Sequence, residues 1–220
     1  RCLSRGLGDV YKRQGLYEKK HFDLAGFSVG IVERDSLLPS NKITEGDIII
    51  GFPSNGLHSN GYSLVRNIIN QKNIKTSLPM PNNSKKTISE VLLDPTKIYV
   101  KLILDLLNNT SGVKAISHIT GGGITENLPR VFPNTSVTAQ INLSSWDRPE
   151  IFTWLKNLGN IDEDEILKTL NCGIGLTLVV DPNELENTSN YLNKINEDYF
   201  IIGEIINNKK DQSEIIYNKG

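Results

Sequence analysis

DIIIGFPSNGLHSNGYSLVR, residues 47–66, contains in one stretch a strand, a loop and the start of a helix. Residues 47–52 form a short, continuous apolar run, which is typical of a buried strand because so short a run makes a poor helix. From about Asn60 the apolar side chains fall on one helical face: Leu64, Val65, Ile68 and Ile69. The stretch therefore predicts a strand that leads through a polar, glycine-containing loop into an amphipathic helix.

The rest of the chain interleaves strands and helices without strict alternation. Strands are predicted where β-branched and apolar residues gather, at residues 27–33, 113–119, 137–143, 174–180, 200–206 and 215–217. Helices are predicted where apolar residues recur at helical spacing, at residues 97–107, 125–131, 149–158, 162–170 and 182–193. Thr96 is expected to cap the first of these helices, and the polar residues 71–89 are expected to form a surface loop. The order predicts an α+β fold, α/β layered, in which helices flank a mixed β-sheet.

Length, charge and composition narrow the class of protein. A chain of 220 residues suffices for one core, or for one domain and part of another. The formal net charge of -1, without runs of like charge, gives no electrostatic footprint for nucleic acid or for an anionic membrane. Cys2 and Cys172 are too few for a disulfide framework or a metal cluster, and indicate free thiols in a reducing compartment. With no apolar run long enough for a membrane span, we expect a cytoplasmic protein that binds neither nucleic acid nor membrane.

The first fourteen residues, RCLSRGLGDVYKRQ, show neither helical nor strand periodicity and stop just before a patterned segment. We interpret residues 1–14 as a leader that does not belong to the protein. The alternative is a genuine disordered N-terminus.

The loop within residues 51–66 has features of an anion site. Its three glycines, Gly51, Gly56 and Gly61, let the backbone approach a ligand closely and adopt positive φ. The N–H groups at the start of the following helix favour an anion. The alternative is a structural loop in which Ser59 and Asn60 cap that helix. The pattern of a P-loop is absent.

A second glycine loop occurs in HITGGGITENLPRVFP, residues 118–133. Three adjacent glycines cost conformational entropy on folding, so close approach of the backbone to a ligand is favoured over a purely structural turn. His118 is a candidate proton donor or anion partner, although a lone histidine is more often a hydrogen-bonded structural residue. Two of the three histidines, His58 and His118, lie in the two glycine loops, which raises interest in both.

Two shorter stretches have simpler interpretations. In LLDPTKIYVK, residues 92–101, Asp94 and Lys97 are interpreted as solvated surface beside a helix start. In NCGIGLTLVV, residues 171–180, Gly173 and Gly175 flank an apolar strand and are interpreted as its tight entry into the core.

These stretches together resemble the phosphoribosylformylglycinamidine cyclo-ligases, also called aminoimidazole ribonucleotide synthetases. The resemblance rests on residues 51–66 and 118–133, and on FDLAGFSVGIVE, LLDPTKIYVK, SSWDRPEIFTWL and NCGIG in the same order. It covers residue 15 to about residue 217. It implies that residues 15–43 are a remnant of the ATP-binding, dimerising N-terminal domain, and that residues 44–220 are the C-terminal domain of the aminoimidazole ribonucleotide synthetase type. The acidic nucleotide motif and the Gly-Gly-Glu motif of the family are not found.

The resemblance implies a ligase of purine biosynthesis that uses ATP and Mg²⁺. ATP phosphorylates the formyl oxygen of formylglycinamidine ribonucleotide, a nitrogen of the amidine side attacks the activated carbon, and phosphate leaves as 5-aminoimidazole ribonucleotide forms. A homodimer is implied for the full-length parent, and this chain alone is expected to be inactive. The alternatives are another ATP-using enzyme of the superfamily, or an inactive fragment that acts only as a binding module.

The resemblance also implies roles for individual residues. It assigns His58 and His118 to catalysis, either to stabilise the transferring phosphoryl group or to move a proton. It assigns the other polar and glycine positions to substrate or phosphate binding: Ser54, Ser59, Asn60, Gly61, Thr120, Gly121, Gly122, Gly123 and Asn127.

Overall fold

The computed structural model describes residues 26–39, 42–81, 83–132, 136–207 and 215–218. The chain divides into two compact units, residues 1–37 and 38–220, and each is described by itself. The described part of the first unit contains one 3-10 helix, η1 (Arg34–Ser36), and no strand. The strand predicted over residues 27–33 is therefore wrong, because a strand needs a partner for its backbone hydrogen bonds. The side chains of Phe27, Val29 and Ile31 are exposed there.

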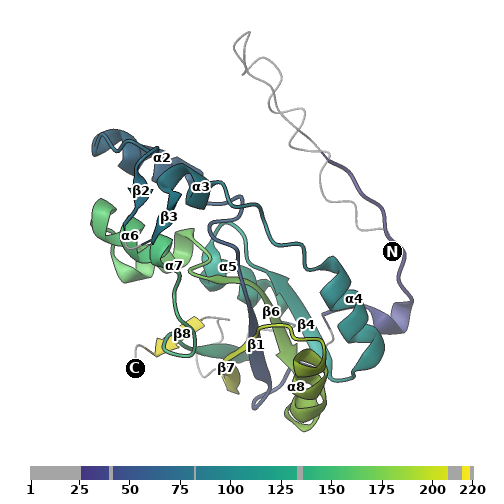
Figure 1. Ribbon diagram of the computed structural model, residues 1–220. Helices are drawn as coiled ribbons and strands as arrows, with labels where there is room; N and C mark the ends of the chain where they lie inside the picture. The colour runs from purple at the N-terminus through teal and green to yellow at the C-terminus, as the bar shows by residue number, and fades with distance from the viewer. Residues whose placement is uncertain (1–25, 40–41, 82, 133–135, 208–214, 219–220) are drawn as a thin grey trace. The chain divides into compact units, whose positions relative to one another are not determined.

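A six-stranded mixed sheet forms the centre of the second unit (Figure 1). Its strands in spatial order are β4 (Val113–His118), β6 (Ile174–Val180), β1 (Ile48–Pro53), β7 (Phe200–Asn207), β5 (Val137–Asn142) and β8 (Ile215–Asn218). Neighbouring strands are antiparallel except for β5 and β8, which are parallel. β1 and β4 both run antiparallel to β6, which lies between them, so their C-terminal ends meet at the same end of the sheet. The two glycine loops follow these two strands and are thereby brought together.

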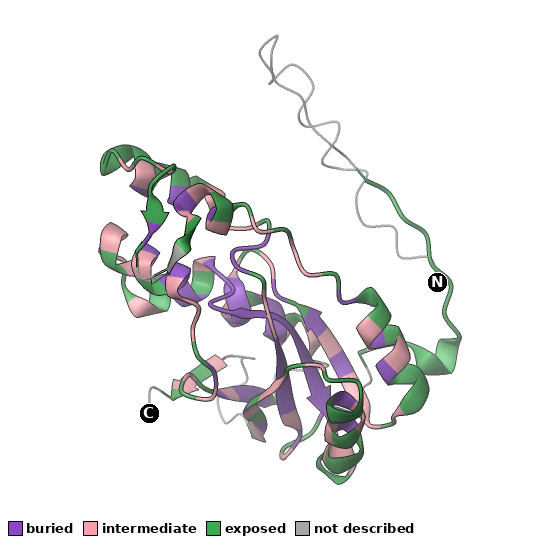
Figure 2. Ribbon diagram, viewed as in Figure 1, coloured by how far each residue is buried: buried purple, intermediate pink, exposed green. Residues whose placement is uncertain are grey.

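Helices pack on the sheet and beyond one end of it. They are α2 (Tyr62–Gln71), α3 (Ile88–Leu92), α4 (Val100–Asn109), α5 (Gly123–Asn127), η2 (Leu128–Val131), α6 (Glu150–Gly159), α7 (Glu163–Thr169), η3 (Pro182–Glu184) and α8 (Leu185–Lys194). α4 and α8 share one buried core with β1 and β6, and α5 and η2 share another with β1, β5 and β7. Figure 2 shows the resulting buried centre of the sheet and the exposed outer sides of α4 and α8. The predicted α+β fold with a mixed sheet flanked by helices is confirmed.

A third core lies among α2, α3, α6 and α7, which gather at the end of the sheet (Figure 1). It includes a hairpin of β2 (Pro79–Met80) and β3 (Asn83–Thr87), so the prediction of a surface loop over residues 71–89 is wrong. Met80, Ile88 and Leu92 are buried in this core. Thr87 and Glu90 form a capping box at the start of α3. Because most residues of this segment are polar, the sequence pattern did not indicate β2, β3 or α3.

Helix α4 begins later than predicted. The sequence indicated a helix from residue 97 with Thr96 as its cap, but α4 begins at Val100 and its N-cap is Tyr99. The backbone N–H of Lys97 donates to Nε2 of His58 at 3.4 Å, and the Tyr99 hydroxyl donates to the carbonyl of Pro53 at 2.8 Å. These contacts with the end of β1 and its loop hold the segment out of the helix.

No helix in the described segments has the length and apolar character that crossing a membrane requires.

Candidate functional site

The loop of residues 54–61, between β1 and α2, is held against the start of β6. The backbone N–H of Ser54 donates to the carbonyl of Gly173 at 2.8 Å. The buried side chain of Asn171 donates to the carbonyl of Gly56 at 2.8 Å and accepts from the N–H of Gly173 at 2.9 Å. Ser54 Oγ lies 3.0 Å from both the Gly56 carbonyl and Asn171 Oδ1. Ser54 thus contributes to the shape of this loop, and Asn171 is a supporting residue that sequence reasoning missed.

The start of α2 differs from the capped loop that the sequence left open. Its N-cap is Gly61 at φ 75°, and no side chain caps the helix. Ser59 Oγ instead lies 3.2 Å from Thr96 Oγ1. The interpretation of Ser59 and Asn60 as helix caps is therefore wrong. The first N–H groups of α2 have no acceptors within the helix, so this end retains its capacity to bind an anion.

The three adjacent glycines serve different purposes. Gly122, at φ +100°, is the N-cap of α5. A Cβ on Gly123, at φ +58°, would lie 2.0 Å from the carbonyl oxygen of Leu167 and 2.8 Å from that of Leu170. A Cβ on Gly121 would find only Asn60 Oδ1, at 3.7 Å. Turn geometry and close packing thus account for Gly122 and Gly123, while Gly121 is exposed and open to a ligand.

Asn60 and Gly121 bring the two loops together. They belong to loops that follow different strands, yet the Asn60 side chain lies beside the Gly121 backbone. Both residues are at least partly accessible to solvent. At this pair the two predicted halves of the site lie close together.

The side chain of Asn127 holds the glycine turn through hydrogen bonds. Its buried amide Nδ2 donates to the carbonyls of Gly123 at 2.7 Å and Gly121 at 3.1 Å. Its Oδ1 accepts from Thr120 Oγ1 at 3.1 Å and from Arg130 Nη1 at 3.2 Å. Asn127 and Thr120 therefore direct their polar atoms to each other and to the backbone of the turn.

The two histidines differ in exposure and in partners. His58 is 3% exposed, and its Nε2 accepts the backbone N–H groups of Asn55 at 3.1 Å and Lys97 at 3.4 Å. His118 ends β4 and is exposed. The rings of both histidines flank Tyr99, with centroid distances of 6.2 Å for His58 and 6.3 Å for His118. His118 is thus the histidine that a ligand can reach.

Gly175 in β6 makes room for this arrangement. A Cβ on Gly175 would lie 2.1 Å from the Tyr99 hydroxyl oxygen and 2.5 Å from Cε1 of His58. Sequence reasoning placed this glycine at the tight entry to a core strand of residues 174–180, and β6 has these bounds. The missing side chain of Gly175 leaves space for the two rings.

Burial, together with the nearby positive charges of His118 and Lys97, lowers the pKa of His58 to about 4. The unfolded chain takes up a proton near the ordinary pKa of 6.5, whereas the folded chain resists protonation until about pH 4. The stabilising contribution of neutral His58 is therefore complete above pH 6.5 and is lost as the pH falls toward 4. At about 1.4 kcal/mol per pKa unit, the loss amounts to roughly 3 kcal/mol.

We expect His58→Asn to flatten the dependence of unfolding free energy on pH within this window. Urea unfolding at a series of pH values, with wild type and variant compared at each pH, measures the difference in slope. Parallel curves for the two proteins would contradict the assignment of a neutral, buried imidazole.

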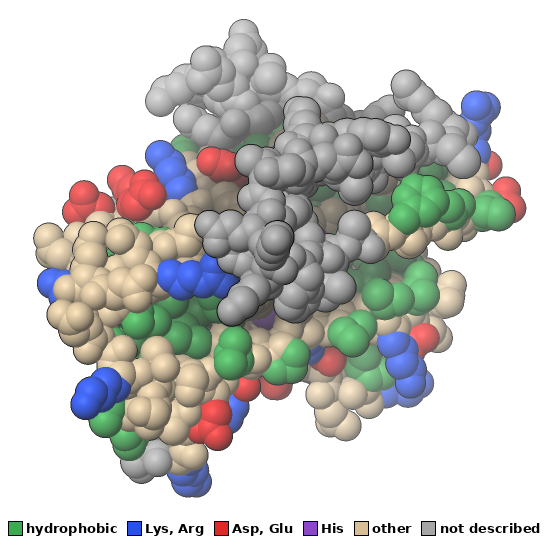
Figure 3. All heavy atoms as spheres, turned by 90° about the horizontal axis from the view of Figure 1, so that it is seen from above, with side chains coloured by type: hydrophobic (Ala, Val, Ile, Leu, Met, Phe, Trp, Pro, Cys, Tyr) green, Lys and Arg blue, Asp and Glu red, His purple; other side chains and the backbone are tan. Residues whose placement is uncertain are grey.

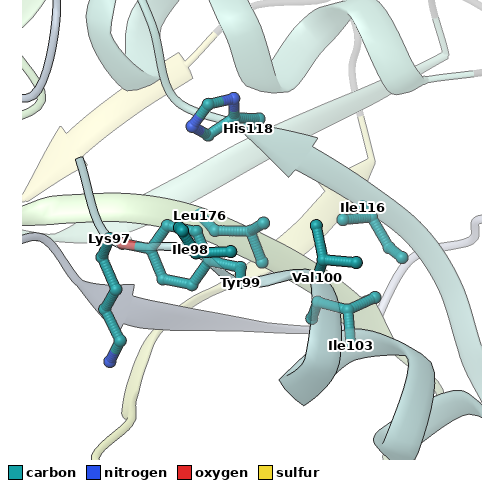
Figure 4. Close-up of a pocket in the computed structure, with 8 residues that line it drawn as sticks. All are labelled: Lys97, Ile98, Tyr99, Val100, Ile103, Ile116, His118 and Leu176. Carbon is teal, nitrogen blue, oxygen red and sulfur yellow. The ribbon is translucent and has the colours of Figure 1, made fainter. Parts of the chain in front are cut away.

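An apolar cavity of about 320 Å³ opens beside His118 (Figure 4). It is lined by Lys97, Ile98, Tyr99, Val100, Ile103, Ile116, His118 and Leu176. Lys97 Nζ lies 2.5 Å from Glu197 Oε1 and 5.6 Å from the centroid of the Tyr99 ring. Lys97 therefore belongs to the site region, and its interpretation as solvated surface is wrong. The family resemblance of LLDPTKIYVK was the signal that could have identified it.

The described residues give no sign of a resident metal. No three His, Cys, Asp or Glu side chains among them lie close enough to hold a metal ion.

Cys172 is a free, buried thiol whose pKa is raised to about 12 chiefly by burial. The face in Figure 3 shows acidic, basic and hydrophobic side chains side by side.

Comparisons with known proteins identify the relatives of this chain. Residues 44–216 match the family described as AIR synthase related protein, C-terminal domain. A phosphoribosylformylglycinamidine cyclo-ligase of Chromobacterium violaceum is 44% identical over 204 residues, which cover 93% of this chain and 58% of that protein. The bifunctional purine biosynthetic protein purD of Dictyostelium discoideum is 46% identical over 215 residues, which cover 96% of this chain and 26% of that protein.

A solved structure shares the fold at low sequence identity. A thiamine-monophosphate kinase from Stenotrophomonas maltophilia K279a matches with a TM-score of 0.56 and 17% identity, over 85% of this chain and 54% of that chain. The chain thus spans 58% of the cyclo-ligase relative and 26% of the bifunctional one. Since the family match extends over most of its length, the chain belongs to the AIR synthase related proteins, in the family of their C-terminal domain.

Proposed function

We propose that this chain provides the C-terminal, substrate-binding part of a phosphoribosylformylglycinamidine cyclo-ligase. The reaction is the ATP-dependent closure of formylglycinamidine ribonucleotide to 5-aminoimidazole ribonucleotide in purine biosynthesis. The single observation that carries the proposal is the meeting of the two glycine loops, where Asn60 lies beside Gly121. The 44% identity to a cyclo-ligase supports the choice of reaction.

The loops offer groups suited to phosphoryl transfer, which depends mainly on positioning and charge stabilisation. In the proposal, the first N–H groups of α2 after Gly61 and the exposed backbone of Gly121 bind phosphate oxygens. Ser59 and Asn60 orient the substrate, and His118 hydrogen-bonds the transferring group or moves a proton. The support for this division is accessibility, since each of these residues is exposed or half-buried.

The remaining predicted residues shape the site. Ser54 hydrogen-bonds within its loop and to Asn171, and Thr120 and Asn127 hydrogen-bond within the glycine turn. Gly122 and Gly123 satisfy turn geometry and packing. ATP is a substrate in this proposal. No three His, Cys, Asp or Glu side chains lie together among the described residues, so the proposal assigns no Mg²⁺ ligand to them.

The proposal extends to the organisation of the whole enzyme. Residues 44–220 form its C-terminal domain, and residues 15–43 belong to the domain before it. The family match from residue 44 supports this boundary. A homodimer and a cytoplasmic location are part of the same proposal, supported by the similarity to purine biosynthetic enzymes.

Turnover tests the proposed reaction. The chain is assayed alone and joined to the N-terminal portion of the Chromobacterium relative, with ATP, Mg²⁺ and formylglycinamidine ribonucleotide. We expect ATP-dependent formation of aminoimidazole ribonucleotide by the joined protein and none by the chain alone. A folded joined protein that binds ATP but yields no product would contradict the proposal and favour another ATP-using enzyme of the superfamily.

His118→Asn is expected to lower kcat of the joined protein by about 10²- to 10⁴-fold, the usual range for a lost proton-transfer group. Because His118 is exposed, its replacement should change the unfolding free energy by no more than about 0.5 kcal/mol. Lys101→Met, on the exposed side of α4, is the control and should leave kcat unchanged. A kcat for His118→Asn equal to that of the control would exclude a catalytic role for His118.

A further inference from the structure

We infer that His58 is a positioning residue, a neutral imidazole that fixes the loop of residues 54–61 to the segment of residues 95–97. The kinetic part of this inference rests on the proposed function, whereas its structural part does not. It replaces the catalytic role that the family resemblance suggested for His58 and leaves His118 as the histidine that meets the substrate.

The hydrogen bonds of His58 define its protonation state. Its Nε2 accepts two backbone N–H groups, from Asn55 at 3.1 Å and from Lys97 at 3.4 Å. A ring nitrogen that accepts hydrogen bonds carries no proton, so the proton of the neutral ring is on Nδ1. Protonation of Nε2 would set an N–H against two N–H donors and break both contacts. The nitrogen that holds the two segments together therefore cannot also carry a proton to a substrate.

The other ring nitrogen is also unsuited to proton transfer. Nδ1 of His58 is buried and has no hydrogen-bond partner among the described residues. The ring is enclosed by the β6 backbone at Gly175 and by Tyr99. A buried donor without a partner lowers stability. The backbone of His58 also adopts φ 56°, a value that residues other than glycine seldom adopt. These two costs are consistent with a ring retained for its Nε2 contacts.

Two further contacts join the loop of residues 54–61 to the segment of residues 95–97. Asn55 Nδ2 donates to the carbonyl of Pro95 at 3.3 Å, and Ser59 Oγ lies 3.2 Å from Thr96 Oγ1. With the hydrogen bond that the Lys97 N–H donates to His58, three residues of the loop contact three consecutive residues of the segment. His58 is the buried member of this set. It thereby fixes the backbone of Lys97, whose side chain lines the cavity beside His118.

The state of the wild-type ring can be measured first, in the 220-residue chain. Nitrogen-detected NMR of the histidine side chains at neutral pH should show His58 with a proton on Nδ1 and none on Nε2. A proton on Nε2 would overturn the inference, and this measurement does not depend on any variant or on activity.

A matched pair of variants then separates positioning from proton transfer. His58→Gln can place an amide oxygen near the position of Nε2, whereas His58→Asn tolerates the positive φ but is too short to reach it. We expect the amide protons of Asn55 and Lys97 to remain protected from exchange in the glutamine variant and to lose protection in the asparagine variant. In the joined protein, we expect KM within about threefold of wild type for glutamine. For asparagine we expect KM raised at least about tenfold over wild type, which corresponds to about 1.4 kcal/mol or more.

The outcomes distinguish the two hypotheses. A proton carrier would predict loss of kcat by about 10²-fold or more in both variants, with the amides still protected in the glutamine variant, and that result would overturn the inference. Unchanged amide protection in His58→Asn would also overturn it. Failure of the proposed function would appear differently, as absence of turnover in the wild-type joined protein, while amide exchange in the chain alone still reports the role of His58.

Discussion

Gly123→Ala is expected to destabilise the second unit by about 3–5 kcal/mol, because overpacking and backbone strain act at one position. The added Cβ would lie 2.0 Å from the Leu167 carbonyl oxygen and 2.8 Å from that of Leu170, and neither backbone can move without disturbing α7. The φ of +58° adds strain for any side chain. Urea unfolding followed by circular dichroism of the 220-residue chain measures the effect.

Gly121→Ala is the matched control for this prediction. Its Cβ would meet only Asn60 Oδ1, at 3.7 Å, so the unfolding free energy should change by less than about 1 kcal/mol. In the joined protein the same change should weaken substrate binding, because the methyl group occupies the open face between the loops. Equal destabilisation by both substitutions would show that the two glycines do not differ in the way the structure indicates.

Lys114→Met is expected to destabilise the same unit by about 3–5 kcal/mol, because it leaves a buried carboxylate without its counter-charge. Lys114 Nζ lies 2.6 Å from Asp47 Oδ1 and 3.1 Å from Asp181 Oδ2. The Asp47 side chain is 1% exposed, and its other oxygen accepts the N–H of Thr44 at 2.9 Å. Chemical unfolding at neutral pH measures the loss.

Two further variants test the cause. Asp181→Asn removes the partner whose side chain is 29% exposed, and should cost no more than about 1 kcal/mol. Adding Asp47→Asn to Lys114→Met removes the uncompensated charge and should restore part of the stability. If Lys114→Met lowers the unfolding free energy no more than Asp181→Asn does, the ion pair of Lys114 and Asp47 does not stabilise the unit as expected.

Much of the fold could be predicted because apolar patterns report local structure directly. The apolar run before Gly51 is β1, and the helical face around Val65 is the buried side of α2. The run of residues 174–180, apolar except for Thr177, is β6, buried at every position. In contrast, the hairpin in residues 71–89 depends on a few anchors such as Met80 in a polar segment, so its pattern was too weak to detect.

The errors near the site arose from tertiary contacts. The start of α4 is displaced because His58 and Pro53 use the polar groups of Lys97 and Tyr99. Local pattern cannot show these contacts, since they join residues 39 and 46 positions apart in the sequence. The family resemblance assigned both glycine loops to one substrate site, but the pattern could not show that Asn60 lies beside Gly121.

The most direct test of the central claim, that both glycine loops form one substrate site, is a map of amide chemical shifts in the 220-residue chain as formylglycinamidine ribonucleotide is added. We predict that the amides of Asn60, Gly61, His118 and Gly121 shift together along one binding curve. Shifts confined to one loop or to another surface would contradict the claim. So would unmoved loop amides at concentrations that saturate turnover in the joined protein.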